Sequence, residues 1–198
     1  MKTVFFDVDT QLDFVCAAGA LAVPGAQDID SSLTRLTRFA AANHIQIVSS
    51  ADAHAEDDAE FKKWRPHCVV GTIGQHKTAG TLLNEQLILS SRPDAFDEIR
   101  SRVQGASQII VEKQMLDCFT NPNLGALLKL LAADHYVVYG VVTEYCVGSA
   151  AFGLLETGAR VHLVTDAIKS LSVEKGRETI QRFRARGGEL TTAADLLS

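Results

Sequence analysis

Three side chains that can together perform nucleophilic acyl transfer stand far apart in this sequence, as Asp9, Lys113 and Cys146. Each of them follows a short apolar run. An aspartate beside a thiol can take its proton, and a lysine can keep that aspartate charged and stabilise the thiolate. Such a group attacks a carbonyl carbon without a histidine. The sequence therefore predicts a cysteine-dependent site, provided that folding brings the three residues together.

Cys146 gives the clearest of the three signals. It belongs to residues 140–147 (G-V-V-T-E-Y-C-V), where an apolar strand is expected to run directly into a helix. Thr143 is a natural N-cap, which places Cys146 in the first helical turn. Unpaired N–H groups and the helix dipole favour a thiolate there. The alternative is a buried structural cysteine that packs as a small hydrophobic residue.

The acid and the cation are weaker signals when each is considered alone. Asp9 and Asp13 share one turn with Gln11, and the alternative is a polar loop held by local hydrogen bonds. Asp7 competes with Asp9 as the base, since it lies only two residues earlier. Lys113 follows an apolar run, where a solvated charge is the ordinary alternative. The prediction rests on all three residue types falling at strand ends.

A second group of residues could hold a metal ion. Asp52 and His54 follow an apolar run, and side chains two residues apart in extended backbone point to the same face. A carboxylate and an imidazole can therefore grip one ion. The alternative is a pair of polar loop residues among many acids.

The elements that must position these residues alternate between strand and helix. Strands are expected at residues 4–8, 45–48, 108–111, 136–142 and 160–164, with a short last strand beginning at Leu190. Helices are expected at residues 29–43, 123–133, 144–157 and 173–186, and residues 55–91 read as a long loop with a small excursion. Strands of nearly continuous Val, Ile and Leu indicate a parallel sheet covered on both faces. We therefore expect one three-layer α/β/α domain over residues 1–198, with its ligand site at the carboxyl ends of the strands.

Composition narrows the functional classes. The net charge of −5 and the lack of basic runs argue against a nucleic-acid partner. No window of eighteen apolar residues suggests a membrane span, and the N-terminal residues enter a strand without a signal-peptide pattern. We expect a cytoplasmic protein in which Cys16, Cys68, Cys118 and Cys146 are free thiols.

Three motifs carry a resemblance to a known family. Residues 9–14 (D-T-Q-L-D-F) resemble the D-x-Q-x-D-F opening of nicotinamidases and their isochorismatase-like relatives. Residues 19–25 (G-A-L-A-V-P-G) resemble their second turn, and residues 140–147 resemble their nucleophile motif, G-V-x-T-[DE]-Y-C-V. The motifs occur in the family's order over nearly the whole chain. The resemblance implies the isochorismatase-like hydrolase fold, with a mainly parallel central sheet.

The resemblance also implies the roles of the catalytic residues. Asp9, Lys113 and Cys146 match the family's triad, and the register with Gln11 favours Asp9 over Asp7 as the base. In the family, the peptide bond before the position of Val142 is cis. Backbone N–H groups matching those of Val142 and Cys146 form the oxyanion hole.

For the metal, the resemblance implies a ligand set of Asp52, His54 and His67, because nicotinamidases carry D-x-H followed by a downstream histidine. Glu60 is a candidate for a further ligand. Two imidazoles with a carboxylate suit Zn, our first expectation, and also Fe or Mn.

The expected activity is therefore a metal-containing cysteine amidohydrolase that converts nicotinamide to nicotinate and ammonia, a step of pyridine nucleotide salvage. Phe14, Trp64 and Tyr145 are expected to wall an aromatic substrate, with core packing as their alternative role. The expected partner is a small amide, with neither nucleic acid nor membrane, and a homo-oligomer stays open.

Two alternatives remain beside this activity. One is another amide or ureide hydrolase of the same superfamily, and the other is a non-catalytic relative that binds a small molecule. Many family members have D-W-H-P where this chain has D-A-H-A at residues 52–55, and the loop from His54 to His67 is shorter than in some members. Both departures change the pocket wall, so they bear on the substrate.

Overall fold

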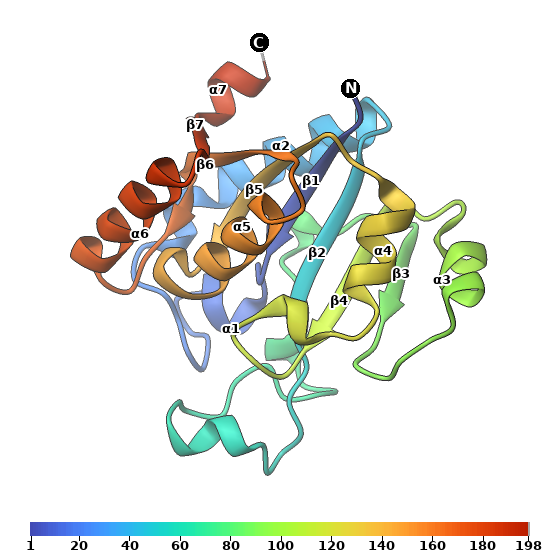
Figure 1. Cartoon of the computed structure of the whole chain (residues 1–198). Coiled ribbons are helices and arrows are strands. Elements are labelled where there is room, and N and C mark those ends of the chain that lie inside the picture. Colours follow the sequence, from blue (N-terminus) through green and yellow to red (C-terminus); the bar gives the residue numbers. More distant parts are fainter. Residues whose placement is uncertain (198) are drawn as a thin grey trace.

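A computed structural model describes residues 1–197 as a central parallel sheet with helices on both faces (Figure 1). The sheet has seven strands in the order β3-β4-β2-β1-β5-β6-β7, and every neighbouring pair is parallel. The strands are β1 (Thr3–Val8), β2 (Gln46–Asp52), β3 (Gln86–Leu89), β4 (Gln108–Lys113), β5 (His135–Val141), β6 (Arg160–Lys169) and β7 (Glu189–Thr191). Since all strands run in one direction, their carboxyl ends meet at a single edge.

The helices form two layers. The hydrophobic cluster on one face of the sheet includes side chains of α1 (Leu12–Val15), α2 (Asp30–Ala42) and α7 (Ala193–Leu196). The cluster on the other face includes side chains of α3 (Phe96–Val103), α4 (Leu124–Leu131), α5 (Gly148–Leu155) and α6 (Val173–Ala185). The observed architecture is the three-layer α/β/α arrangement that the sequence predicts.

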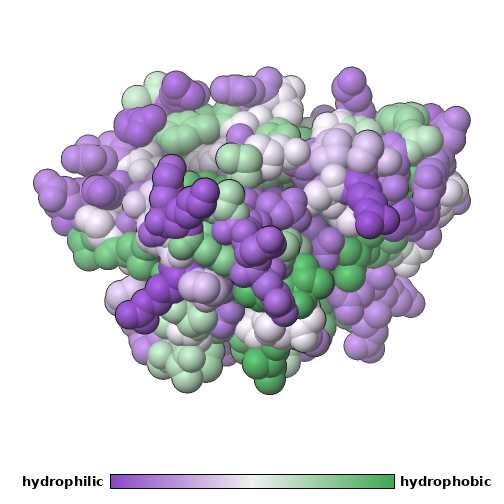
Figure 2. Space-filling model, turned by 90° about the horizontal axis from the view of Figure 1, so that it is seen from below, coloured by the Kyte–Doolittle hydropathy of each residue, from purple (hydrophilic) through white to green (hydrophobic). Residues whose placement is uncertain are grey.

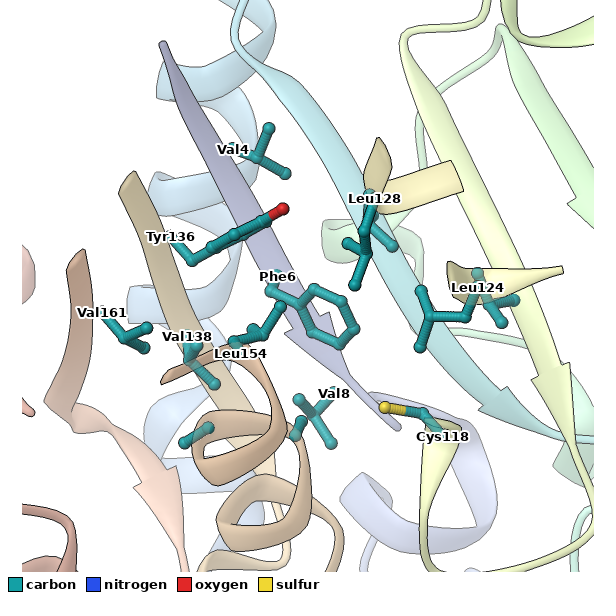
Figure 3. Packing of buried hydrophobic residues seen from close by; sticks show 14 of the residues in the cluster. Val4, Phe6, Val8, Cys118, Leu124, Leu128, Tyr136, Val138, Leu154 and Val161 are labelled. Carbon is teal, nitrogen blue, oxygen red and sulfur yellow. The ribbon is translucent and has the colours of Figure 1, made fainter. Parts of the chain in front are cut away.

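Alternation along the strands explains how both faces are covered. In β1, Val4, Phe6 and Val8 point into the cluster beneath α4 and α5, where Figure 3 shows them beside Leu128 and Leu154. Phe5 belongs to the opposite cluster, beneath α2. Because successive strand residues face opposite sides, a strand buried on both faces must be apolar at nearly every position.

The structure extends several predicted elements and adds four, the strand β3 and the helices α1, α3 and α7. β2 runs to Asp52 and β4 to Lys113, so both functional side chains lie on strand ends rather than in loops. The short edge strand β3 and the helix α3 are not predicted by the sequence. β3 has only four residues and α3 buries only Ile99, so neither produces a long apolar pattern.

The predicted helix 144–157 begins differently. Residues Thr143–Val147 form a π-helical turn in which Tyr145 has non-helical dihedral angles, and α5 starts only at Gly148. Thr143 does not cap the helix as predicted, because its hydroxyl is buried without a hydrogen-bond partner and Val142 occupies the cap position.

Candidate active site

The carboxyl edge of the sheet brings Asp9, Lys113 and Cys146 together. Asp9 follows β1, Lys113 is the last residue of β4, and Cys146 lies in the π-helical turn after β5. The Lys113 Nζ is 2.9 Å from Asp9 Oδ2 and 3.7 Å from Cys146 Sγ. All three side chains are buried. The ammonium group therefore lies within reach of both the carboxylate and the sulfur.

Asp9 has an unusual backbone. Its φ is +50°, a left-handed conformation that non-glycine residues rarely adopt. The Ser50 hydroxyl donates to Asp9 Oδ1 at 2.6 Å, and Lys113 approaches the other carboxylate oxygen. These contacts hold the carboxylate toward β2 and β4.

Asp7, the competing acid, has a different environment. Its carboxylate forms an ion pair with Lys77 Nζ at 2.7 Å and accepts hydrogen bonds from the hydroxyls of Thr10 and Ser49. It does not line the cavity that contains Cys146. The geometry is consistent with Asp9, rather than Asp7, as the acid that serves the thiol.

Burial controls the protonation of the site. It raises the pKa of the Cys146 thiol well above its ordinary range, and Asp9 raises it further while Lys113 opposes the shift. Burial also raises the pKa of Asp9, although Lys113 lowers it in part. The resting thiol therefore keeps its proton, in contrast to the thiolate expected from the helix dipole, and Asp9 is a stronger base than an exposed aspartate.

The π-helical turn that carries Cys146, here called the nucleophile turn, follows a close approach of β5 to β1. Gly140 in β5 has a φ of +121°, and a Cβ at this position would lie 2.1 Å from the Val8 carbonyl oxygen of β1. Only glycine fits there. The peptide bond between Val141 and Val142 is cis, as the family resemblance implies.

Asp52, His54 and His67 form a candidate metal centre beside the triad. Asp52 Oδ2 is 3.7 Å from His54 Nε2 and 3.6 Å from His67 Nε2, and one ligand atom from each residue lies within 4.8 Å of the others. The buried His54 Nε2 has no hydrogen-bond partner. An unpaired buried nitrogen beside a carboxylate is typical of a metal site before the ion binds. The ligand atoms of the three residues therefore fit a divalent metal.

Outer contacts orient both imidazoles. His54 Nδ1 is 3.0 Å from Asp58 Oδ2, and His67 Nδ1 is 2.7 Å from the Arg65 carbonyl oxygen. With Nδ1 donating in each ring, Nε2 is the free nitrogen that faces Asp52.

The metal group and the triad share one cation. The Lys113 ammonium also makes a short contact with Asp52 Oδ1. Although burial alone raises the pKa of Asp52, Lys113 and the two histidines lower it well below its ordinary range. Asp52 is therefore ionised and available as a ligand. The sequence gives no sign of this bridge, because the register that sets Asp52 beside Lys113 is a property of the β2–β4 pairing.

Glu60 lies near this group without joining it. It lines the same cavity, but it does not belong to the close set of three ligand atoms found among the described residues. Burial, and then the charge of Asp52, raise the pKa of its carboxyl. As a metal ligand it remains a proposal.

One cavity, with an empty volume of about 420 Å³ including its mouth, is lined by Asp9 and Cys146 of the triad and by Asp52 and His67 of the metal group. Phe14, Trp64 and Tyr145 all line it, as expected of substrate-binding residues. Phe14 packs 5.3 Å from the His67 ring, and Trp64 meets Tyr145 edge to face at 5.5 Å. Figure 2 views this face of the molecule, where hydrophobic residues interrupt a mainly hydrophilic surface.

Sequence reasoning missed several residues of the site. The remaining apolar wall is supplied by Leu21, Val23, Leu116, Val141 and Leu171. Leu21, Val23 and Val141 lie within the motifs at residues 19–25 and 140–147, but an apolar side chain carries no chemical signal that would assign it to a cavity. Gln11 is different, because its place in the motif at residues 9–14 marks it as a residue of the site. Its side chain bonds both the N–H and the carbonyl of Asp52, at 2.7 and 2.8 Å, and so ties the catalytic turn to the metal site.

Among the helices of residues 1–197, none has the length and apolar character needed to cross a membrane.

Comparison with known proteins gives consistent results. A profile described as the isochorismatase domain matches residues 3–195. A nicotinamidase of Escherichia coli is 24% identical over 95% of this chain and 93% of its own length. The crystal structure of a Pyrococcus horikoshii pyrazinamidase in complex with zinc superposes with a TM-score of 0.80, at 24% identity, over 97% of this chain and 99% of that one.

A further structural neighbour has a different name. The N-carbamoylsarcosine amidase of Thermoplasma acidophilum superposes with a TM-score of 0.76, at 22% identity, over 98% of this chain and 97% of that one. The shared fold is thus found in proteins named for different amide substrates, and the choice between them depends on the cavity.

Proposed function

The chain belongs to the isochorismatase family of hydrolases, and we propose that it is a metal-containing cysteine amidohydrolase that converts nicotinamide to nicotinate and ammonia. The observation that carries this proposal is the position of Lys113 Nζ, 2.9 Å from the Asp9 carboxylate and 3.7 Å from the Cys146 sulfur, beside a buried trio of metal-ligand residues.

The proposed mechanism has two stages. In the first, Asp9 takes the proton of Cys146 as the sulfur attacks the carboxamide carbon, and the backbone N–H groups of Val142 and Cys146 stabilise the oxyanion. Asp9 then gives the proton to the leaving ammonia, which leaves an acyl thioester. In the second stage, Asp9 removes a proton from water, the resulting hydroxide attacks the thioester, and nicotinate leaves as the thiol regains its proton. The raised pKa values of Asp9 and Cys146 suit this transfer, because both groups hold the proton more tightly than exposed ones.

Asp52, His54 and His67 would hold the metal, for which zinc is our first choice and iron or manganese the alternatives. When bound, it would supply a Lewis-acid contact for the pyridine nitrogen of the substrate. Lys113 would keep Asp52 ionised for this purpose, and Asp58 would hold the His54 ring in place.

The apolar and aromatic wall of the cavity favours an aromatic amide. Beside the acids Asp9, Asp52 and Glu60, the lining is mainly apolar. The aromatic side chains Trp64 and Tyr145 provide flat apolar surface for a ring.

The second candidate is another amide hydrolase of the same triad, favoured by the structural likeness to an N-carbamoylsarcosine amidase. A non-catalytic binding protein is a third, weaker candidate, since it would have no need of a complete triad.

An ammonia-release assay over nicotinamide, pyrazinamide, benzamide and simple ureides separates these candidates. We expect fast release from nicotinamide and pyrazinamide, slow release from benzamide and none from ureides. Preference for a ureide would refute the nicotinamide assignment while leaving the cysteine chemistry in place. No release from any amide would support the binding protein.

A further inference from the structure

A buried charge pair that the proposed mechanism does not use contacts the catalytic turn, which is the segment from Asp9 to Phe14 after β1. Lys77 and Asp7 are both buried, and their charged groups are 2.7 Å apart. Taking two charges out of water carries a penalty that can exceed the attraction between them, so a buried pair is weak evidence for a stabilising role and is consistent with a role in fixing geometry.

The two charges converge on one hydroxyl. Lys77 Nζ donates to Thr10 Oγ1 at 2.7 Å, and Thr10 Oγ1 donates to Asp7 Oδ1 at 2.9 Å. The Thr81 hydroxyl oxygen lies 2.8 Å from Thr10 Oγ1. Thr10 is itself fully buried, so none of these bonds is shared with solvent. Few positions and orientations of the Thr10 side chain can satisfy all three neighbours.

Thr10 directly follows Asp9, whose φ of +50° is strained for a residue with a side chain. Such a conformation is unfavourable for a residue with a side chain and persists only where its surroundings impose it. The backbone is held as well, because Leu12 N–H donates to the His76 carbonyl at 2.8 Å and Thr78 N–H donates to the Thr10 carbonyl at 2.9 Å. Residues 76–78 therefore contact the turn through both side-chain and main-chain hydrogen bonds.

We infer that Lys77, Asp7 and Thr10 are positioning residues that hold Asp9 in its left-handed conformation, with its carboxylate facing Lys113 and Cys146. None of the three lines the cavity that contains Cys146. They act on the proton-transfer steps through the placement of Asp9, and substrate binding does not depend on them. The inference rests on the proposed role of Asp9 and not on which amide is the substrate.

The test removes the central hydroxyl while keeping the shape of the side chain. In Thr10→Val, we expect kcat to fall on the order of 10- to 100-fold, the usual cost of a misplaced catalytic group, with KM and metal content unchanged. Thr10→Ser, which retains the hydroxyl, should keep kcat close to the wild-type value. The substrate is whichever amide the wild-type protein hydrolyses fastest.

Thr37→Val is the matched control. Thr37 is equally buried and donates to the Leu33 carbonyl within α2, without any bond to the catalytic turn. The control should lose stability but retain kcat. Wild-type kcat in Thr10→Val, an equal fall in the Thr37 control or in Thr10→Ser, or a loss confined to KM would each overturn the inference.

A second variant guards against misfolding. Asp7→Asn/Lys77→Met removes both charges together, so neither is left buried and uncompensated. It should show the same fall in kcat at unchanged KM, whereas wild-type kcat would overturn the inference. Asp9→Asn is measured in parallel. If that variant turns over at the wild-type rate, the proposed triad fails, which is a separate outcome from failure of the positioning network.

Discussion

At the scale of single residues, the proposed mechanism starts from a protonated thiol. Burial raises the pKa of Cys146, and we propose that the Asp9 carboxylate accepts the proton during attack. Cys146→Ser should therefore reduce amide turnover by roughly 10⁴-fold or more, since the members of a catalytic triad act as a unit. Ammonia release measures this loss.

Cys16→Ser is the matched control, because Cys16 is an exposed free thiol outside the site. It should turn over at the wild-type rate. Turnover by Cys146→Ser close to that of the control would exclude the covalent mechanism.

The choice of base is also tested at this scale. Asp9→Asn should lower kcat by about 10²- to 10⁴-fold, the usual cost of removing a general acid–base. Asp7→Asn should cost less, because an amide oxygen still accepts the Thr10 hydroxyl. A larger loss in Asp7→Asn than in Asp9→Asn would show that the assignment of the base is wrong.

The sequence predicts the reactive residues of the site but not the backbone conformation and contacts that position them. Asp9, Lys113 and Cys146 can be chosen from residue type and position at strand ends. The positive φ of Asp9 and the bridge from Lys113 to Asp52 cannot, since the first lies in a turn held by long-range contacts and the second follows from the register of β2 and β4.

At the scale of elements, the loops after β4 and β6 complete the cavity with Leu116 and Leu171. These side chains are 39% and 37% exposed, so a bound ring would cover part of their apolar surface. Truncation of either to alanine should raise KM for nicotinamide by roughly 3- to 10-fold, because about 1 kcal/mol of apolar contact is lost. Initial-rate kinetics check this effect.

Leu190→Ala provides the control for this pair. Leu190 has the same 37% exposure as Leu171 but lies on β7, outside the cavity. Its KM should equal that of the wild type. A rise as large as that of Leu171→Ala would show that the effect does not come from contact between the two loops and the substrate.

The opposite edge of the sheet, where the strands begin, carries a pair of histidines. His135 Nε2 is 2.6 Å from His162 Nδ1, and Thr3 and Glu189 contact the outer nitrogens of the two rings. Burial lowers the pKa of His135, and the charges of His162 and Arg160 lower it further, while Glu189 opposes them.

Stability should therefore depend on pH in a defined direction. A histidine with a lowered pKa in the folded state takes up its proton more readily when unfolded, so the free energy of unfolding falls as pH drops below about 6.5. His135→Gln should reduce this slope between about pH 7.5 and about pH 5.5, measured by urea unfolding at matched metal content. His44→Asn, at an exposed histidine, should retain it. An unchanged slope in His135→Gln would show that His135 is not the source of this pH dependence.

The elements differ in how well the sequence predicts them. β1, β2, β4, β5 and β6 are evident because each contains a run of buried apolar residues, although polar residues occupy much of β2, β4 and β6. The edge strand β3 and the π-helical turn at Thr143–Val147 are not, since the first is short and half exposed and the second differs from a helix only at Tyr145.

At the scale of the whole molecule, function follows from the parallel direction of the sheet. Four strand ends deliver Asp9, Asp52, Lys113 and the nucleophile turn to one edge, and the long loop after β2 returns His67 to the same place. The alternation of strand and helix predicts this convergence. The order of the strands and the shape of the loop depend on long-range packing, which a single sequence does not display.

The central claim is that this assembly reads an aromatic carboxamide through its ring nitrogen, and one comparison tests it. Nicotinamide and benzamide differ at that nitrogen, so kcat/KM for the two amides is measured in wild type and in His67→Ala, with metal content determined for both. We expect the wild type to prefer nicotinamide strongly and His67→Ala, once its metal is lost, to lose most of that preference. An unchanged preference in the metal-free variant would show that the ring nitrogen is not recognised by the metal.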